Sequence, residues 1–247
     1  MLQDEIFLTA EWRYLAMLNY EVDEGLVLPF VPAGTEIDRW NGKIFISLVG
    51  FRFLKTRIFG VPVPFHVNFD EVNLRFYVRR HERDEIRRGV VFIKEIVPRR
   101  LIAWVARSFY NENYVALPMA HAIGADGERG LTVAYRWRTA NGWSAIRLKS
   151  QGVAELANEG SHEQFITEYY WGYATQPDGG CVEYRVTHPA WKVWSARSAD
   201  FAGDVDALYG REFAAVLRGH PSSAFLAEGS AVRVMRGRKV RPLGLKP

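Results

Sequence analysis

A long segment of alternating side chains limits the folds open to this chain more than any other feature. Between Asn68 and Val78 the sequence reads NFDEVNLRFYV, and the apolar residues from Val72 onward recur at every second position. A period of two places successive side chains on opposite faces of a strand, whereas a helix repeats every 3.6 residues or so. One face carries Glu71, Asn73 and Arg75. The segment therefore predicts a strand of an antiparallel sheet with one apolar and one polar face.

The neighbouring segments predict antiparallel partners for this strand. Residues 90–97 read VVFIKEIV and are expected to pair with it, while the charged run over residues 79–88 is expected to form an exposed turn between the two strands. Upstream, Asn41-Gly42 stands between residues 36–38 and a strand-like run that begins at Lys43. Asn-Gly in this setting is the strongest short hairpin signal. These segments predict the start of an antiparallel meander.

Short helices are predicted at the periphery of the sheet. Residues 23–32 repeat apolar side chains at helical spacing, and Asp23 is placed to cap them. A longer helix is expected to begin at Pro98, and further short helices are expected from Ser161 and over residues 204–217. The helix after Pro98 would gather its apolar side chains in one stripe, formed by Leu101, Ile102, Val105, Ala106 and Phe109.

The remainder of the chain adds strands and no second domain. Strand-like segments are YVALPMAH, LTVAYRW, SAIRLKS, CVEYRVTH and WKVWSA, with Asn141-Gly142 as a turn. No repeat, low-complexity segment or linker is present. A chain of 247 residues is long for one domain, but all-β domains reach this size. The sequence predicts one domain over residues 1–247, mainly β (α+β), with a few short peripheral helices.

Composition excludes several classes of function. Cys181 is the single cysteine, so an internal disulfide and a paired-cysteine metal or redox site are excluded. The acidic residues Asp4, Glu5 and Glu11 occupy the positions where a secretory signal would be basic, and no apolar run is long enough to cross a bilayer. We therefore expect a cytoplasmic protein that makes no membrane contact.

The distribution of charge argues against a nucleic-acid partner. The pI is about 9.2 and the formal net charge is +4, but much of the excess lies in the last stretch of the chain. These terminal basic residues are Arg233, Arg236, Arg238, Lys239, Arg241 and Lys246. A solvated basic terminus accounts for them without a nucleic-acid surface. The chain also lacks GxGxxG, Walker and GxSxG motifs, so no cofactor is expected.

Four blocks of sequence carry a resemblance to a known family. In chain order they are WRYLAMLNYEVDEGLVLPFVPAGTEIDRWNGKIFISLVGFRF, then FDEVNLRFYVRR, then GVVFIKEIV with ARSFYNENYVALPM, and finally VTHPAW. Over nearly its whole length the chain resembles the YqjF-like family of uncharacterised bacterial proteins, also called domain of unknown function 2071. That family is similar in fold to acetoacetate decarboxylase, whose barrel holds a small 3-keto acid. The resemblance therefore implies an antiparallel β barrel.

The resemblance also limits the chemistry that such a barrel can perform here. In acetoacetate decarboxylases a lysine forms a Schiff base with the keto group, and an adjacent lysine lowers its pKa. Matching the motif carries the lysine pair onto Tyr114 and Val115, and no lysine occurs between Lys94 and Lys149. The usual decarboxylase route is therefore disfavoured, although the pocket can serve another ligand.

The same resemblance selects candidate ligand-binding residues. Glu71 is the counterpart of a family glutamate, and Asn73 and Arg75 would project from the same strand face. Arginine binds carboxylates through two parallel hydrogen bonds. The matched crossover segment adds the remaining candidates, Arg107, Tyr110 and Tyr114. The alternatives are a solvent-facing strand for the first three residues, and a surface ion pair with a core aromatic for Arg107 and Tyr110.

Two residues are candidates for acid–base chemistry. Glu71 is the first, and His188, at the junction of two strands, is the best placed of the histidines. A structural hydrogen bond is the alternative role for His188. The remaining histidines show no paired spacing, so no metal site is expected.

The sequence leaves two functions open. The first is a small-molecule-binding domain, a lyase or hydrolase of a small carboxylate-bearing metabolite, in which Glu71 and Arg75 orient the ligand. The second is a non-enzymatic structural or interaction domain that forms a homodimer through an exposed surface, with side chains filling the barrel. A cavity that contains Glu71 favours the first function, and a closed interior favours the second.

Overall fold

The protein is built almost entirely from strands of one connected sheet. The computed structural model describes residues 5–82, 85–99, 113–127 and 129–240. Its long strands are β1 Ile6–Val22, β3 Ile44–Ile58, β5 Phe69–Glu82, β6 Glu85–Val97, β9 Gly130–Thr139, β10 Gly142–Leu156, β13 Lys192–Ala202 and β14 Ser223–Met235. Shorter strands are β2 Glu36–Ile37, β4 Val61–Pro62, β7 Tyr114–Ala116, β8 Met119–Asp126, β11 Trp171–Thr175, β12 Cys181–Thr187 and β15 Arg238–Val240. The mainly β fold predicted from the sequence is confirmed.

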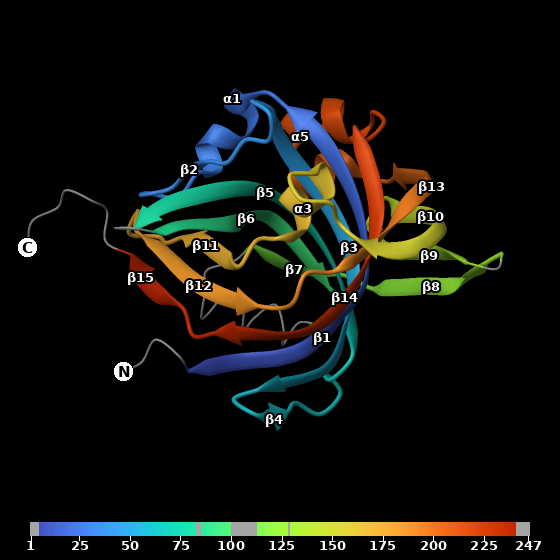
Figure 1. Ribbon diagram of the computed structural model, residues 1–247, viewed down its shortest axis with the longest axis horizontal. Coiled ribbons are helices and arrows are strands. Elements are labelled where there is room, and N and C mark those ends of the chain that lie inside the picture. Colours follow the sequence, from blue (N-terminus) through green and yellow to red (C-terminus); the bar gives the residue numbers. More distant parts are fainter. Residues whose placement is uncertain (1–4, 83–84, 100–112, 128, 241–247) are drawn as a thin grey trace, which may run out of the picture.

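A subset of the strands closes into a ring. Hydrogen-bonded neighbours run β12–β11–β6–β5–β3–β1–β14, and β14 pairs again with β12. Strand β1 bends as it follows the ring, because its pairing with β3 shifts register between Arg13 and Ala16, where Tyr14 has φ 57°. Beyond the ring the sheet continues from β14 to β13, and β10, β9 and β8 extend it to one side (Figure 1).

Both faces of β5 are buried, and this decides where its polar side chains lie. Val72, Leu74 and Phe76 pack in a core shared with Tyr135 and Trp137 of β9. The opposite face points into the ring, where its aromatic residues join a second core. The alternative of a solvent-facing strand is therefore wrong: Glu71, Asn73 and Arg75 are 3%, 2% and 8% exposed.

The helices are short, and the one over His162–Thr167 packs side chains into the core inside the ring. They are α1 Glu24–Val27, the 3-10 turn η1 Leu28–Phe30, α3 His162–Thr167, α4 Val205–Tyr209 and α5 Arg211–Leu217. Ser161 caps α3 by accepting a hydrogen bond from the backbone of Gln164, whereas the side chain of Asp23 makes no capping bond to α1. The helix predicted over 204–217 is broken at Gly210, whose φ of 87° cannot continue a helix. The helix predicted from Pro98 lies outside the described residues.

One prediction of local pairing needs correction. Asn41 and Gly42 do form a tight turn with positive φ, bridged by Trp40 and Lys43. However, β2 before this turn pairs with β5, and β3 after it pairs with β1 and β5, so the two flanking segments do not form a hairpin with each other. The antiparallel pairing of β5 with β6 is as predicted.

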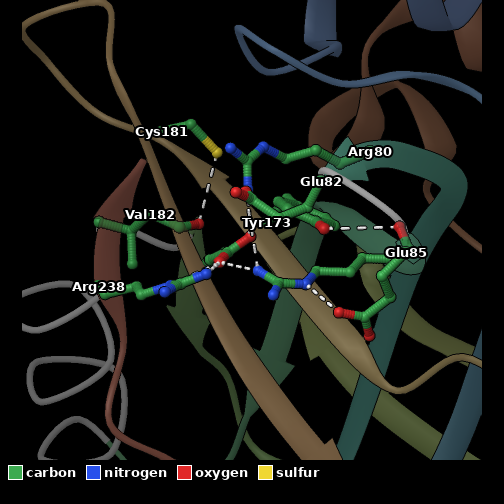
Figure 2. A network of polar contacts seen from close by, with 9 residues as sticks. Arg80, Glu82, Glu85, Tyr173, Cys181, Val182 and Arg238 are labelled. Atoms are coloured by element: carbon green, nitrogen blue, oxygen red, sulfur yellow. Dashed lines mark hydrogen bonds and ion pairs between the residues drawn. The ribbon is translucent and has the colours of Figure 1, made fainter. Parts of the chain in front are cut away.

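The charged run over residues 79–88 is not simply an exposed turn. Its described residues continue β5 and β6, and Arg80 and Arg87 bind Glu183 of β12, which is fully buried. Arg238 of β15 donates to the same carboxylate, and Figure 2 shows its side chain in one network with that of Arg80. Part of the basic terminus is therefore structural, which corrects the prediction of a solvated tail. The network joins the β5–β6 end to β12 and β15.

Candidate functional site

A cavity of about 210 Å³ lies within the ring of strands. Its walls come from every strand of the ring, from β7 and α3, and from the segment that follows β12. Most of the lining is aromatic or aliphatic, and a small group of polar side chains on β5, β6 and β7 stands out against it. A concave, largely apolar pocket with a few convergent polar groups is the usual form of a small-molecule site.

Glu71 lies on β5 with its carboxylate in the cavity wall. Asn73 donates a hydrogen bond to Oε1 at 3.0 Å, and the Tyr114 hydroxyl of β7 donates to Oε2 at 3.2 Å. Burial raises the pKa of Glu71 to about 7, and the two hydrogen bonds and the charge of Arg75 oppose part of that rise. Near neutral pH this carboxyl group therefore exchanges between its protonated and ionised forms.

Arg75 provides the positive charge of the cavity. Its Nη2 donates to the Ile166 carbonyl of α3 at 3.5 Å, and the guanidinium lies 5.8 Å from the centre of the Tyr77 ring. No carboxylate lies within 4 Å of this guanidinium among the described residues, and its buried Nε has no hydrogen-bond partner there. Glu71 is near enough for the charge of Arg75 to affect its pKa, but the two side chains form no direct ion pair. A buried guanidinium without a direct ion pair is costly. It is therefore available to an anionic ligand.

A β-bulge puts an unpredicted acid into the cavity. The pairing of β5 with β6 shifts between Leu74, opposite Lys94, and Arg75, opposite Phe92. Simple alternation from Phe92 would turn Lys94 toward the cavity, but the lining contains Phe92 and Glu95 instead. Lys94 is directed to Asn113, whose Oδ1 accepts its hydrogen bond at 3.0 Å. No lysine lines the cavity among the residues that the structure describes.

His188 also reaches the cavity, at the end of β12. Its ring stacks on Trp191 with centroids 4.2 Å apart, and Nδ1 lies 2.9 Å from the Pro189 carbonyl oxygen. Burial lowers the pKa of His188, and the charge of Arg75 lowers it further. The imidazole is therefore neutral at neutral pH.

The structure brings most of the predicted site residues together. The cavity within the ring of strands is lined by Glu71, Asn73, Arg75, Tyr114 and His188. Arg107 and Tyr110 lie outside the described residues. Glu95 was missed because the bulge reverses the phase of β6. The aromatic lining was missed because the sequence offers no signal that separates a cavity wall from a core.

Neither a metal-binding group nor a membrane-spanning helix is found among the described residues. They contain no group of three or more histidine, cysteine, aspartate and glutamate side chains able to hold a metal. None of their helices has the length and hydropathy needed to span a membrane.

Sequence comparison gives the family of the chain. Residues 9–231 match domain of unknown function 2071, a family described as an uncharacterized conserved protein. The chain belongs to this family. A relative within reach of direct sequence comparison is the uncharacterized protein YqjF of Bacillus subtilis, 26% identical over 191 residues, which cover 76% of this chain and 75% of YqjF.

Solved structures with the same fold include acetoacetate decarboxylases. The enzyme from Legionella pneumophila superposes with a TM-score of 0.65 at 11% identity, covering 96% of this chain and 88% of the enzyme. The enduracididine biosynthesis enzyme MppR, in complex with pyruvate, gives a TM-score of 0.67 at 13% identity, with coverage of 98% and 93%. At such low identity these likenesses establish the fold, which is the one that the sequence resemblance predicted.

Proposed function

We propose that this member of the YqjF-like family binds a small carboxylate-bearing metabolite inside the ring of strands. The ligand's carboxylate would lie against Arg75, with Glu71 and Tyr114 contacting the adjoining polar atoms. The observation that carries the proposal is the buried guanidinium of Arg75, which lines an apolar cavity and has no acidic partner within 4 Å among the described residues. The complex of the structural relative MppR with pyruvate, itself a small carboxylate, is consistent with it.

The protonation of Glu71 supports the binding of an anion in the same space. Since its pKa is raised to about 7, this carboxyl is about half protonated at neutral pH and largely protonated at lower pH. Protonation removes a charge that would repel a ligand carboxylate and supplies an O–H donor. Glu71 can then give up or take back a proton during a reaction.

The chemistry at this site would differ from that of acetoacetate decarboxylase. A Schiff base needs a lysine, and the described lining has none. A lyase or hydrolase acting on a small organic acid could instead use Glu71 as the acid–base group and Arg75 as the carboxylate anchor. The neutral imidazole of His188 would serve, after Glu71, as a second group that can accept a proton.

The competing proposal of a non-enzymatic homodimer has less support. It was tied to an interior filled by side chains, and the interior holds a cavity that contains Glu71. Self-association remains a prediction.

The proposal is tested by ligand-dependent thermal stabilisation with a panel of small carboxylic acids, including pyruvate and acetoacetate. We expect at least one acid to raise the melting temperature of the wild-type protein. Arg75→Gln should weaken its binding by about tenfold to a hundredfold, because a charge-assisted hydrogen bond is worth roughly 1.5–3 kcal/mol.

Arg79→Gln is the matched control. Arg79 lies on the same strand, outside the cavity, and donates to Glu36 at 2.6 Å. It should leave acid binding unchanged. Equal stabilisation of the wild type and Arg75→Gln by every acid that binds would overturn the proposal.

A further inference from the structure

The cavity changes character along the direction of the strands. At one end, a row of aliphatic side chains crosses the ring from strand to strand. The register pairs Val186 with Val234, Val234 with Leu8, and Leu8 with Ile58. All four side chains line the cavity. This end presents hydrocarbon on four successive strands.

An aromatic row separates the aliphatic end from the polar group. Trp12 is paired with Phe53, and Phe53 with Phe69, whose ring stacks on that of Phe53 at 4.6 Å. Phe69 precedes Glu71 by two positions on β5, so both side chains face the interior. The order along the cavity is therefore Arg75 and Glu71, then the aromatic row, then the aliphatic row.

The length of the apolar part follows from the register of β3. Phe51 is paired with Glu71, and Ile58 stands seven residues farther along the same strand. A bulge at Lys55 takes up one of these residues, so at about 3.3 Å per residue the separation along the strand is on the order of 20 Å. The apolar part of the cavity is therefore much longer than a molecule such as pyruvate.

The loop after β3 completes the apolar end. Val63 and His66 of this loop line the cavity, and β4 holds the loop against the end of β3, at the bottom of Figure 1. Its outer surface is also apolar, since Val61 is 64% exposed and Phe65 86% exposed. A lone exposed apolar residue needs no explanation, but here two belong to the loop that forms the cavity wall.

We infer that the ligand is an amphiphilic acid, with a carboxylate at Arg75 and a hydrocarbon chain that passes the aromatic row and ends among Leu8, Ile58 and Val63. This inference rests on the proposed function and adds the class of ligand to it. The polar side chains would bind the carboxylate of the ligand, and the aliphatic row would contact its hydrocarbon chain. A short keto acid would leave the aliphatic row without contacts.

The inference is tested by calorimetric titration with straight-chain carboxylates of about two to ten carbon atoms, and with the matching primary alcohols. We expect affinity to rise by up to about fourfold for each added methylene until the chain fills the cavity. The alcohols should bind more weakly than the acids of equal length, because they lack the negative charge that would pair with the Arg75 guanidinium.

Val63→Trp should shorten the chain that the cavity accepts. It should weaken binding of the longest acids by tenfold or more and leave the shortest acids that bind unaffected. Val61→Trp is the control, since Val61 is on the same loop but does not line the cavity. Circular dichroism of both variants verifies that they are folded.

The outcomes separate the two proposals. If short acids bind and affinity does not increase with chain length, the amphiphilic ligand is excluded and the carboxylate site stands. If Val63→Trp weakens short and long acids equally, the placement of the chain is wrong. If no acid binds the folded wild-type protein, the carboxylate site itself is excluded, and the inference with it.

Discussion

At the scale of residues, the raised pKa of Glu71 predicts how the stability of the fold depends on pH. Its pKa rises from 4.5 in the unfolded chain to about 7 in the folded protein, because it is buried. The folded state therefore binds more protons between these values, so stability falls as the pH rises through this window. The loss contributed by Glu71 should approach roughly 3 kcal/mol above pH 7 or so.

Urea unfolding of the wild type and Glu71→Gln between pH 5 and 8 measures this contribution. Glutamine cannot ionise, so the variant should gain stability relative to the wild type as the pH rises. Histidines with lowered pKa, such as His162 and His188, act in the opposite direction but equally in both proteins. Glu155→Gln, at an exposed position, is the control. A constant difference between wild type and Glu71→Gln would contradict the account.

The predictability of the site from sequence also differs from residue to residue. Alternation placed Glu71, Asn73 and Arg75 on one face of a strand, and the family resemblance indicated that this face is internal. Neither could place Glu95, because one extra residue at the β5–β6 bulge exchanges Lys94 for Glu95 in the cavity wall.

At the scale of elements, the contacts of Glu183 predict how β12 and β15 are held. Glu183 is fully buried and accepts hydrogen bonds from Arg80, Arg87 and Arg238 (Figure 2). Glu183→Ala should lower the free energy of unfolding by about 3 kcal/mol, since it removes the buried carboxylate that three guanidinium groups share and leaves Arg80 and Arg87 only the more exposed carboxylates of Glu82 and Glu85.

Asp178→Ala provides the comparison at the same end of the sheet. Asp178 binds Lys239 at 3.1 Å with both side chains largely exposed, so its removal should cost under about 1 kcal/mol. Chemical denaturation of both variants measures the two costs. Equal costs would show that the buried network contributes no more than a surface ion pair.

The elements that sequence analysis missed share a physical property. β1 and β14 are neighbouring strands of the ring and are paired on both sides, yet neither was predicted as a strand. Much of β1 is buried on both faces, as Leu15, Ala16, Met17 and Leu18 show, so no alternation appears. Tight turns near Asn41-Gly42 and Asn141-Gly142 were predictable because their chemistry is local, although the second turn is formed by Ala140 and Asn141, with Gly142 opening β10. Strand pairing is set by distant partners.

At the scale of the whole molecule, the connected sheet predicts how the chain unfolds. Strand pairing runs without interruption from β15 to β8, and the core around Val72 and Leu74 includes side chains of both the ring and β9. We therefore propose that residues 1–247 fold as one domain with a single cooperative transition. Calorimetry with matching calorimetric and van't Hoff enthalpies would support this. Two separated transitions would instead show that the ring and the β8–β10 extension unfold independently.

The central claim concerns where an acid binds, and a crystal structure with a bound straight-chain carboxylate tests it most directly. The account predicts that the carboxylate lies within hydrogen-bonding distance of the Arg75 guanidinium, with the chain directed past Phe53 toward Ile58. An acid bound elsewhere on the protein, with the cavity filled by water, would contradict it.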